Sequence, residues 1–146
     1  MDERGILSAE LIFVTLLVII VISSLIPLVN DRINTASQTN ELGNARILAE
    51  NVAETVNKVY ACGNGHSITV NMPENIEGKS FVVVVNSTGA YVKIDGMIGK
   101  SFTAPHKISG SMALKNEEVT LLKNHNYTIR NVEDSKSYSW IVITSD

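Results

Sequence analysis

The clearest pattern along the chain is an uninterrupted apolar run from residue 11 to residue 29. No charged residue interrupts it, and Leu, Ile, Val and Phe fill nearly every position. As an α-helix these 19 residues (11 to 29) would extend roughly 28 Å, close to the ~30 Å hydrocarbon thickness of a bilayer. A small soluble domain has little use for a helix that is apolar on every side. The run therefore predicts a membrane-crossing segment that carries the rest of the chain.

The helical period continues beyond Pro27, but the apolar positions narrow to one stripe. Pro27 is expected to kink the helix rather than end it, and Gly43 is a second weak point. The pattern predicts that the amphipathic half, residues 30–61, lies on a folded domain. The stripe recurs at spacings of three, four or six residues and consists of Ile33, Ala36, Leu42, Ala45, Ala49, Val52, Val56 and Val59.

A clear stop signal follows the stripe, because Gly63 and Gly65 can adopt the left-handed conformation that ends a helix. One helix is therefore predicted from about Ser8 to Ala61. A coiled coil is the alternative for its second half. Asn40 breaks the heptad repeat, as does the glycine three residues later, so packing on a sheet is the favoured interpretation.

From residue 67 onward the apolar period changes to two, which is typical of strands. Asp95-Gly96 is a hairpin-type turn, and bends are expected at Pro73, at 86–89 and at 124–126. No helical pattern intervenes, so we predict an α+β fold in which the long helix covers one face of a small antiparallel sheet or sandwich. The predicted strands are 67–72, 81–85, 90–94, 119–122, 127–130 and 138–144.

Composition narrows the possible functions. The chain has 146 residues, so only one modest domain can follow the apolar run. The net charge of −3 leaves no basic footprint for nucleic acid. Cys62 is the only cysteine, so one chain can form neither a disulfide nor a thiolate metal cluster. We expect Cys62 to be a small, partly buried residue near the helix end.

The residues around the start of the apolar run do not fit a secretory signal peptide. The apolar run is too long, and no small-x-small cleavage site follows it. A cut before the run, between Gly5 and Ile6, would leave the whole apolar helix on the mature protein. The short leader also favours a cytoplasmic N-terminus, since the charges flanking the run are nearly balanced.

The stretch Arg4-Gly5-Ile6-Leu7-Ser8-Ala9-Glu10, followed by the apolar run, resembles the class III signal peptide of archaeal type IV pilin-like proteins. The resemblance covers about the first thirty residues, and it implies a type IV pilin-like fold for the chain. It implies cleavage after Gly5 by a prepilin-type peptidase, which makes Glu10 the fifth residue of the mature chain. Ser8 and Glu10 match the family motif, whereas Ile6 stands where the family has Gln. Pro27 falls where many pilins carry a helix-kinking proline.

Glu10 has a physical role consistent with this resemblance. A carboxylate beside an apolar segment costs roughly 2.5–3.5 kcal/mol near a bilayer centre and less toward the interface, so it needs compensation. Cleavage would create an α-amino group at Ile6, one helical turn away. In a bundle of identical helices, Glu10 of one chain can neutralise that amine of the next and report correct axial register. Alternatively, Glu10 is an interfacial residue that the helix dipole favours.

No catalytic or cofactor site is expected from the sequence. His66, His106 and His125 are scattered without metal-site spacing. No nucleophile elbow, phosphate-binding loop or zinc-binding helix is found. The adjacent carboxylates at 117–118 and 133–134 are expected to be solvated. An enzyme is therefore not expected.

Two tripeptides fit the acceptor pattern for N-glycosylation, Asn86-Ser-Thr88 and Asn126-Tyr-Thr128. Both are expected at turns, where a glycan has room. The alternative interpretation is that Asn86 and Asn126 are simply polar turn residues.

These observations give the following domain organisation. Residues 1–5 form a leader, 6–61 the N-terminal helix with a membrane or fibre-core half at 6–29, and 62–146 an extracellular β domain. The resemblance implies a helical homo-oligomeric filament at the cell surface, serving adhesion. Its partners would be the peptidase, an assembly platform and, before assembly, the membrane. The alternatives are a membrane-anchored extracellular binding module and a minor, tip or pseudopilin component.

Overall fold

The computed structural model describes residues 3–105, 107–113 and 115–146, with side chains from residue 9 onward. One helix, α1, covers Glu3–Cys62. It continues through Pro27, as predicted, and the kink expected at this proline stays a prediction. The chain divides into two compact units, one up to Thr39 and the other from Asn40 to Asp146.

The end of α1 confirms the predicted stop signal. Gly63 and Gly65 have φ values of 86° and 83°, in the left-handed region that favours glycine. The amide of Gly63 donates to the carbonyl of Tyr60 over 3.3 Å. The expectation that Cys62 is partly buried is wrong, because its side chain is exposed. The last buried position of the helix is Val59, and the chain turns at Gly63 before a sheet residue can cover Cys62.

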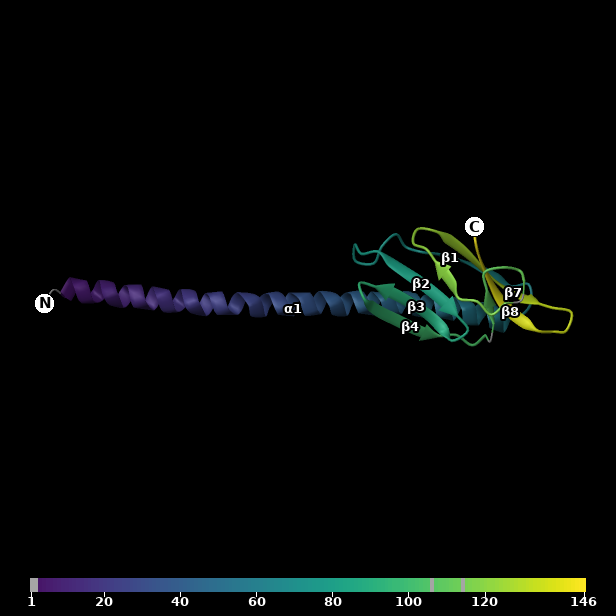
Figure 1. The fold of residues 1–146 in the computed structure, drawn as a ribbon, viewed down its shortest axis with the longest axis horizontal. Helices are drawn as coiled ribbons and strands as arrows, with labels where there is room; N and C mark the ends of the chain where they lie inside the picture. Colours follow the sequence, from purple (N-terminus) through teal and green to yellow (C-terminus); the bar gives the residue numbers. More distant parts are fainter. Residues whose placement is uncertain (1–2, 106, 114) are drawn as a thin grey trace. The chain divides into compact units, whose positions relative to one another are not determined.

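In the part of the chain that the structure describes, eight strands form two four-stranded sheets. Figure 1 labels these strands, except β5 and β6. One sheet has the order β1-β7-β8-β5 and the other β4-β3-β2-β6. The strands are β1 (Ser67–Asn71), β2 (Phe81–Asn86), β3 (Gly89–Ile94), β4 (Met97–Phe102), β5 (Ile108–Ser109), β6 (Val119–Leu121), β7 (Asn126–Glu133) and β8 (Ser139–Ser145).

All six predicted strands are present, and β4 and β5 are additional. The predicted hairpin at Asp95-Gly96 joins β3 to β4, with φ values of 46° and 78° and with Ile94 opposite Met97. The expectation of purely antiparallel pairing needs one correction, because β5 pairs with β8 in parallel. The two residues of β5 reach β8 by a connection from another sheet, which no local pattern encodes.

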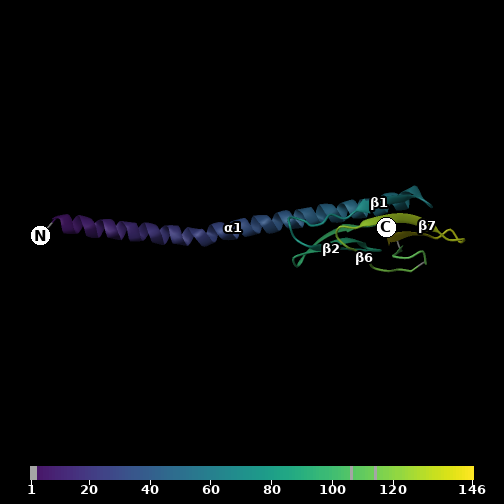
Figure 2. The same ribbon diagram turned by 90° about the horizontal axis from the view of Figure 1, so that it is seen from above.

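The helix and both sheets share one hydrophobic core within residues 40–146. Figure 2 shows the C-terminal part of α1 running alongside the strands. The predicted stripe is buried only from Ala45 onward, because Ile33 is 60% exposed and Ala36 is also exposed. The helix contributes Ala45, Ala49, Val52, Ala53, Val56 and Val59, while the sheets contribute side chains such as Val83, Val92, Leu121, Ile129 and Ile141.

Small residues bring α1 close to β4. A Cβ added to Gly99 would lie 2.7 Å from the backbone carbon of Ala45 and 2.7 Å from the backbone nitrogen of Arg46. Real Cβ atoms essentially never approach backbone so closely, so glycine is required at this position. The fold is therefore α+β, with the C-terminal part of the long helix packed on sheets that are mostly antiparallel.

Candidate functional site

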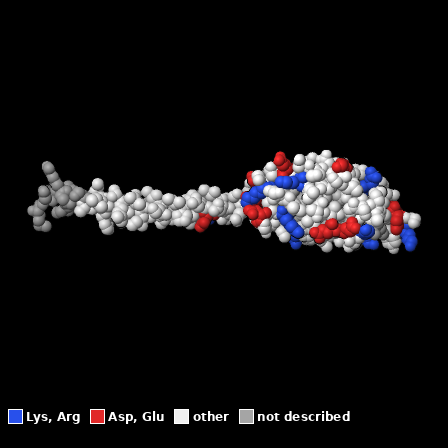
Figure 3. Space-filling model, turned by 45° about the horizontal axis from the view of Figure 1, so that its top comes forward, with Lys and Arg blue, Asp and Glu red and all other residues white. Residues whose placement is uncertain are grey.

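The apolar segment presents large apolar side chains on every side of α1. From residue 11 to residue 29 their exposed fractions run from 48% at Val18 to 68% at Leu11. In Figure 3 this part of the helix is nearly all white, whereas charged residues are spread over the unit from Asn40 onward. By length and composition α1 can cross a membrane. A core helix of a soluble protein and a signal sequence near the N-terminus pass the same test. This segment is not buried, unlike a core helix, and it lies near the N-terminus.

The hydroxyl groups in this segment bond to its own backbone. The Thr15 hydroxyl donates to the carbonyls of Leu11 and Ile12, each over 2.9 Å. The Ser24 hydroxyl donates to the carbonyl of Val21 over 2.7 Å. Because a hydroxyl without a partner is costly in an apolar environment, these bonds make both residues compatible with lipid or with a helical bundle.

The predicted cleavage and register residues lie on the first turns of α1. Gly5, Ile6 and Ser8 have helical backbone, and their side chains lie outside those that the structure describes. Glu10 is exposed, and it is the only charged residue from position 9 to position 30. Residues four apart share one face of a helix, so the backbone nitrogen of Ile6 and the side chain of Glu10 lie on the same side. The predicted pairing joins two different chains, so it stays a prediction.

The first candidate glycosylation site lies at the β2–β3 hairpin. Asn86 ends β2, and its Oδ1 accepts hydrogen bonds from the Thr88 amide (2.9 Å), the Thr88 hydroxyl (2.7 Å) and the Gly89 amide (3.2 Å). These bonds form an Asx turn, so the side chain of Asn86 also stabilises the hairpin. The predicted turn position is confirmed, and modification of Asn86 stays a prediction.

The second candidate site lies at the start of β7. Asn126 is exposed, and its Oδ1 accepts a 2.6 Å hydrogen bond from Nδ2 of Asn71 on the paired strand β1. The expectation that Asn126 lies in a turn is wrong, because it is the first residue of β7 and is paired with Asn71. Modification of Asn126 also stays a prediction.

An ion cluster that the sequence analysis missed holds α1 against two turns of the β domain. The Lys79 amine lies 2.9 Å from the carboxylate of Glu41 and 2.6 Å from that of Asp95. Hydrogen bonding to Asp95, and then to Glu41, holds the pKa of Lys79 above its ordinary value. Glu41 is the first buried residue of α1 among those with described side chains, at 3% exposure. The cluster therefore marks where packing of the helix begins.

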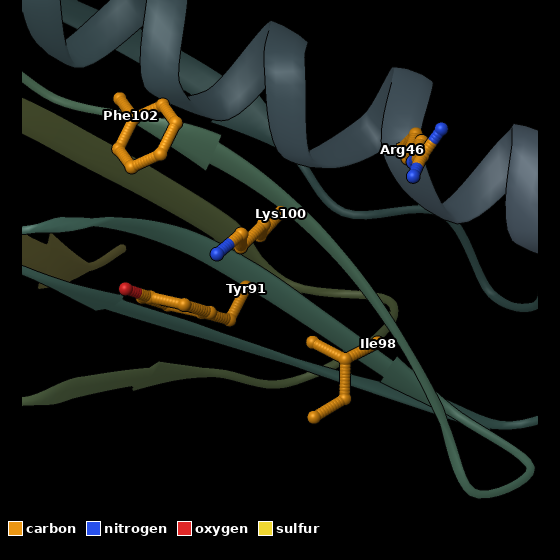
Figure 4. A pocket seen from close by; sticks show the side chains of 5 residues that line it. All are labelled: Arg46, Tyr91, Ile98, Lys100 and Phe102. Carbon is orange, nitrogen blue, oxygen red and sulfur yellow. The ribbon is translucent and has the colours of Figure 1, made fainter.

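A second feature that the sequence analysis missed is a hollow of about 510 Å³ on the β4 side of the domain. Figure 4 shows its lining side chains, which come from α1, β3 and β4: Arg46, Tyr91, Ile98, Lys100 and Phe102. The one signal in the sequence was the alternation of Ile98, Lys100 and Phe102, which places these three side chains on one face of a strand. Arg46 joins them only through the packing of α1 on β4.

The histidines do not form a metal site in the described part of the chain. His66 and His125 are exposed, and His106 lies outside the described residues. Among the side chains that the structure describes, no three His, Cys, Asp or Glu gather so that they could hold a metal ion.

Comparisons of the chain with models of protein families, with curated proteins and with solved structures give no match. The function must therefore be argued from the chain's own residues. The resemblance of the first thirty residues to archaeal type IV pilin-like proteins remains an expectation.

Proposed function

We propose that the chain is a structural, non-enzymatic subunit of an archaeal type IV pilus-like surface filament. One observation supports this most strongly: a helical segment exposes large apolar side chains on all sides and carries one carboxylate, Glu10, at its start. Such a segment needs an apolar partner around its whole circumference. Lipid provides that partner before assembly, and neighbouring copies of the same helix provide it in a filament.

The proposed assembly begins with cleavage between Gly5 and Ile6 by a prepilin-type peptidase. An assembly platform then extracts the subunit from the membrane, and the apolar helices pack into a fibre core. Because lipid is replaced by equally apolar helices, the transfer has little hydrophobic cost. Glu10 pairs with the α-amino group of Ile6 on the neighbouring chain, so a misregistered subunit retains a buried unpaired charge. The β domains form the outer surface, where they serve adhesion.

The test combines mass spectrometry with electron microscopy in an archaeal host that carries the peptidase. The mature protein is expected to begin at Ile6 and to form filaments. Glu10→Gln is expected to be processed normally and to lower the filament yield at least tenfold, because an unpaired amine remains. Glu50→Gln is the matched control, since Glu50 is exposed on the same helix within the folded domain.

Two results contradict the proposal. If the mature protein retains Met1, the proposed cleavage does not occur. Normal filaments from Glu10→Gln remove the register mechanism, even if processing occurs.

The second candidate function is a membrane-anchored extracellular binding module. The observation that favours it is that residues 40–146 have their own core and a lined surface hollow. Here the apolar segment stays in the membrane permanently. An uncleaved N-terminus with no filaments supports this candidate. If the chain is processed at Ile6 but enters filaments only when a different subunit forms them, it is a minor or tip component.

A further inference from the structure

The hollow formed by Arg46, Tyr91, Ile98, Lys100 and Phe102, named here the cationic hollow, lies entirely within residues 40–146. Its volume of about 510 Å³ is within the range of pockets that bind small organic molecules, roughly 300–1,000 Å³. It is open to solvent, so its occupant would be a surface ligand. Figure 4 shows Tyr91, Ile98, Lys100 and Phe102 on β3 and β4, and Arg46 on α1.

The strand register explains why the aromatic groups are available. Lys100 lies directly opposite Tyr91, so these two side chains are neighbours on the outer face of the sheet. Phe102 lies opposite Gly89, which has no side chain to cover the ring. As a result Phe102 is 72% exposed, although it is a large apolar residue. The Lys100 amine lies 5.6 Å from the centre of the Phe102 ring, a cation–π arrangement.

The charge in the cationic hollow is of one sign. Arg46 and Lys100 supply two positive charges, and none of the described side chains that line the space is acidic. Neither forms a salt bridge to a carboxylate within the part of the chain that the structure describes. The chain as a whole carries a net charge of −3, so this concentration of positive charge is not a consequence of composition.

A smaller hollow of about 170 Å³ adjoins the cationic hollow, because Tyr91 lines both. It contains one basic and one acidic residue, Lys93 and Glu118, together with Asn86. The excess positive charge therefore belongs to the side formed by Arg46 and Lys100. The Tyr91 hydroxyl is 2.7 Å from that of Thr88, which leaves a fixed pair of hydroxyl groups at the boundary.

We propose that the cationic hollow binds a carboxylated sugar residue. A guanidinium group holds a carboxylate through two parallel hydrogen bonds, and the Lys100 amine adds a second positive charge. The flat faces of Tyr91 and Phe102 suit the apolar face of a sugar ring, while the Tyr91 and Thr88 hydroxyls suit its hydroxyl groups. An extended acidic peptide fits less well, because the two unpaired cations adjoin aromatic rings instead of forming a line of charges.

The inference deepens the adhesive role within the proposed function, but binding itself does not require assembly. The experiment measures ligand binding to the full chain in non-ionic detergent micelles by isothermal titration calorimetry. The probes are a galacturonic-acid trisaccharide, the matched neutral galactose trisaccharide and tetraglutamate. Binding is expected for the acidic trisaccharide alone, and it should weaken as salt rises.

Substitutions identify the site. Lys100→Gln and Arg46→Gln are each expected to weaken binding of the acidic trisaccharide about tenfold or more, because Lys100 supplies one charge-assisted hydrogen bond and Arg46 supplies two. Phe102→Ala is expected to weaken it by a similar factor. Lys123→Gln is the matched control, because it removes an exposed positive charge from another part of the domain. Circular dichroism confirms that each variant is folded.

Several outcomes overturn the proposal: no binding of the acidic trisaccharide, equal binding of the neutral one, or the same loss in Lys123→Gln. If tetraglutamate binds as tightly as the acidic trisaccharide or more tightly, the ligand is an acidic peptide and the sugar proposal is wrong. The Glu10→Gln variant keeps this test separate from the assembly test, since it should bind the trisaccharide as the unsubstituted chain does. Failure of filament assembly and failure of sugar binding are therefore distinguishable.

Discussion

The two halves of α1 use apolar residues in opposite ways. Residues 11–29 are large and apolar on every side, and all of these large side chains remain about half exposed or more. Within residues 45–59, a stripe of Ala and Val is buried completely or nearly so, whereas Ile47, outside that stripe, is 56% exposed. Both halves are helical, so secondary structure does not distinguish them. The width of the apolar face and the size of its side chains do.

The contrast teaches what each half can bind. A stripe of Ala and Val lets a sheet approach closely enough that Gly99 nearly touches the helix backbone. Long side chains around the whole circumference prevent such an approach, but they suit lipid tails or other helices with equally long side chains. The first half therefore needs partners outside its own domain, whereas the second half finds its partner within it.

The largest expected effect comes from placing the same charge in each half. Val56→Asp should destabilise the domain by about 4 kcal/mol or more, because it buries an unpaired carboxylate in the core. Val18→Asp should leave the stability of the domain within about 0.5 kcal/mol, since residue 18 lies outside that core. Urea unfolding in micelles, followed by the fluorescence of the single tryptophan, Trp140, measures both. Similar losses in the two variants would break the comparison.

The next effect tests the close approach of the sheet to the second half. Gly99→Ala should destabilise the domain by about 1–3 kcal/mol, because the new methyl group meets the backbone of Ala45 and Arg46 at 2.7 Å. Gly110→Ala is the matched control, since its Cβ would meet only ordinary contacts at 3.8 and 3.9 Å. Thermal unfolding of both variants gives the difference. Equal melting temperatures would show that the helix and β4 separate without cost.

A smaller effect, of opposite sign, is expected where packing of the helix begins. A Cβ added to Gly43 meets nothing within 4 Å, so Gly43→Ala should stabilise the domain by about 0.5–1 kcal/mol through helix propensity. Gly63→Ala should instead be destabilising, because φ is +86° there. Urea unfolding distinguishes the two. A loss of stability in Gly43→Ala would mean that the weak point at residue 43 is needed.

The smallest effect is confined to alkaline pH and concerns Lys79. Its pKa is raised in the folded state, so the stabilisation it provides is complete below the ordinary lysine value of 10.5 and is lost as pH rises through the folded pKa. The difference in unfolding free energy between the unsubstituted chain and Lys79→Gln should therefore shrink above pH 10.5. Lys123→Gln should show no such change. A constant difference for Lys79→Gln up to pH 11.5 would contradict the role of the ion cluster.

Local signals in the sequence were sufficient to predict the helix, the residues at which it ends and six of the strands. Gly63 and Gly65 end α1 by their own conformations, and Asp95-Gly96 forms the hairpin that its residue types predict. By contrast β4 was missed, because Gly99 interrupts its apolar alternation and is explained only by the helix that packs on it. The two residues of β5 are a strand only because β8 lies beside them.

The candidate sites divide in the same way. The residues of the first helical turns and the two acceptor tripeptides are visible as short motifs, so the sequence predicts them directly. The cationic hollow joins Arg46 to Lys100, and the ion cluster joins Glu41 to Lys79 and Asp95. These groups are far apart in the chain, and only the register of the strands and the packing of α1 bring them together. The burial of Cys62 was also predicted wrongly, because its exposure depends on where the sheet ends beside the helix.

The position of β1 within its sheet also sets an order of events during synthesis. The only strand that pairs with β1 is β7, with Ser67 opposite Arg130, in the part of the chain that the structure describes. At about 5–20 residues per second, the roughly 100 residues between the apolar segment and β7 take about 5–20 seconds to translate. Throughout that interval the apolar segment has emerged, while the sheet lacks the strand that closes it. In the proposed membrane-anchored state, the chain therefore engages the membrane before β7 is made, and its domain folds from a tethered polypeptide.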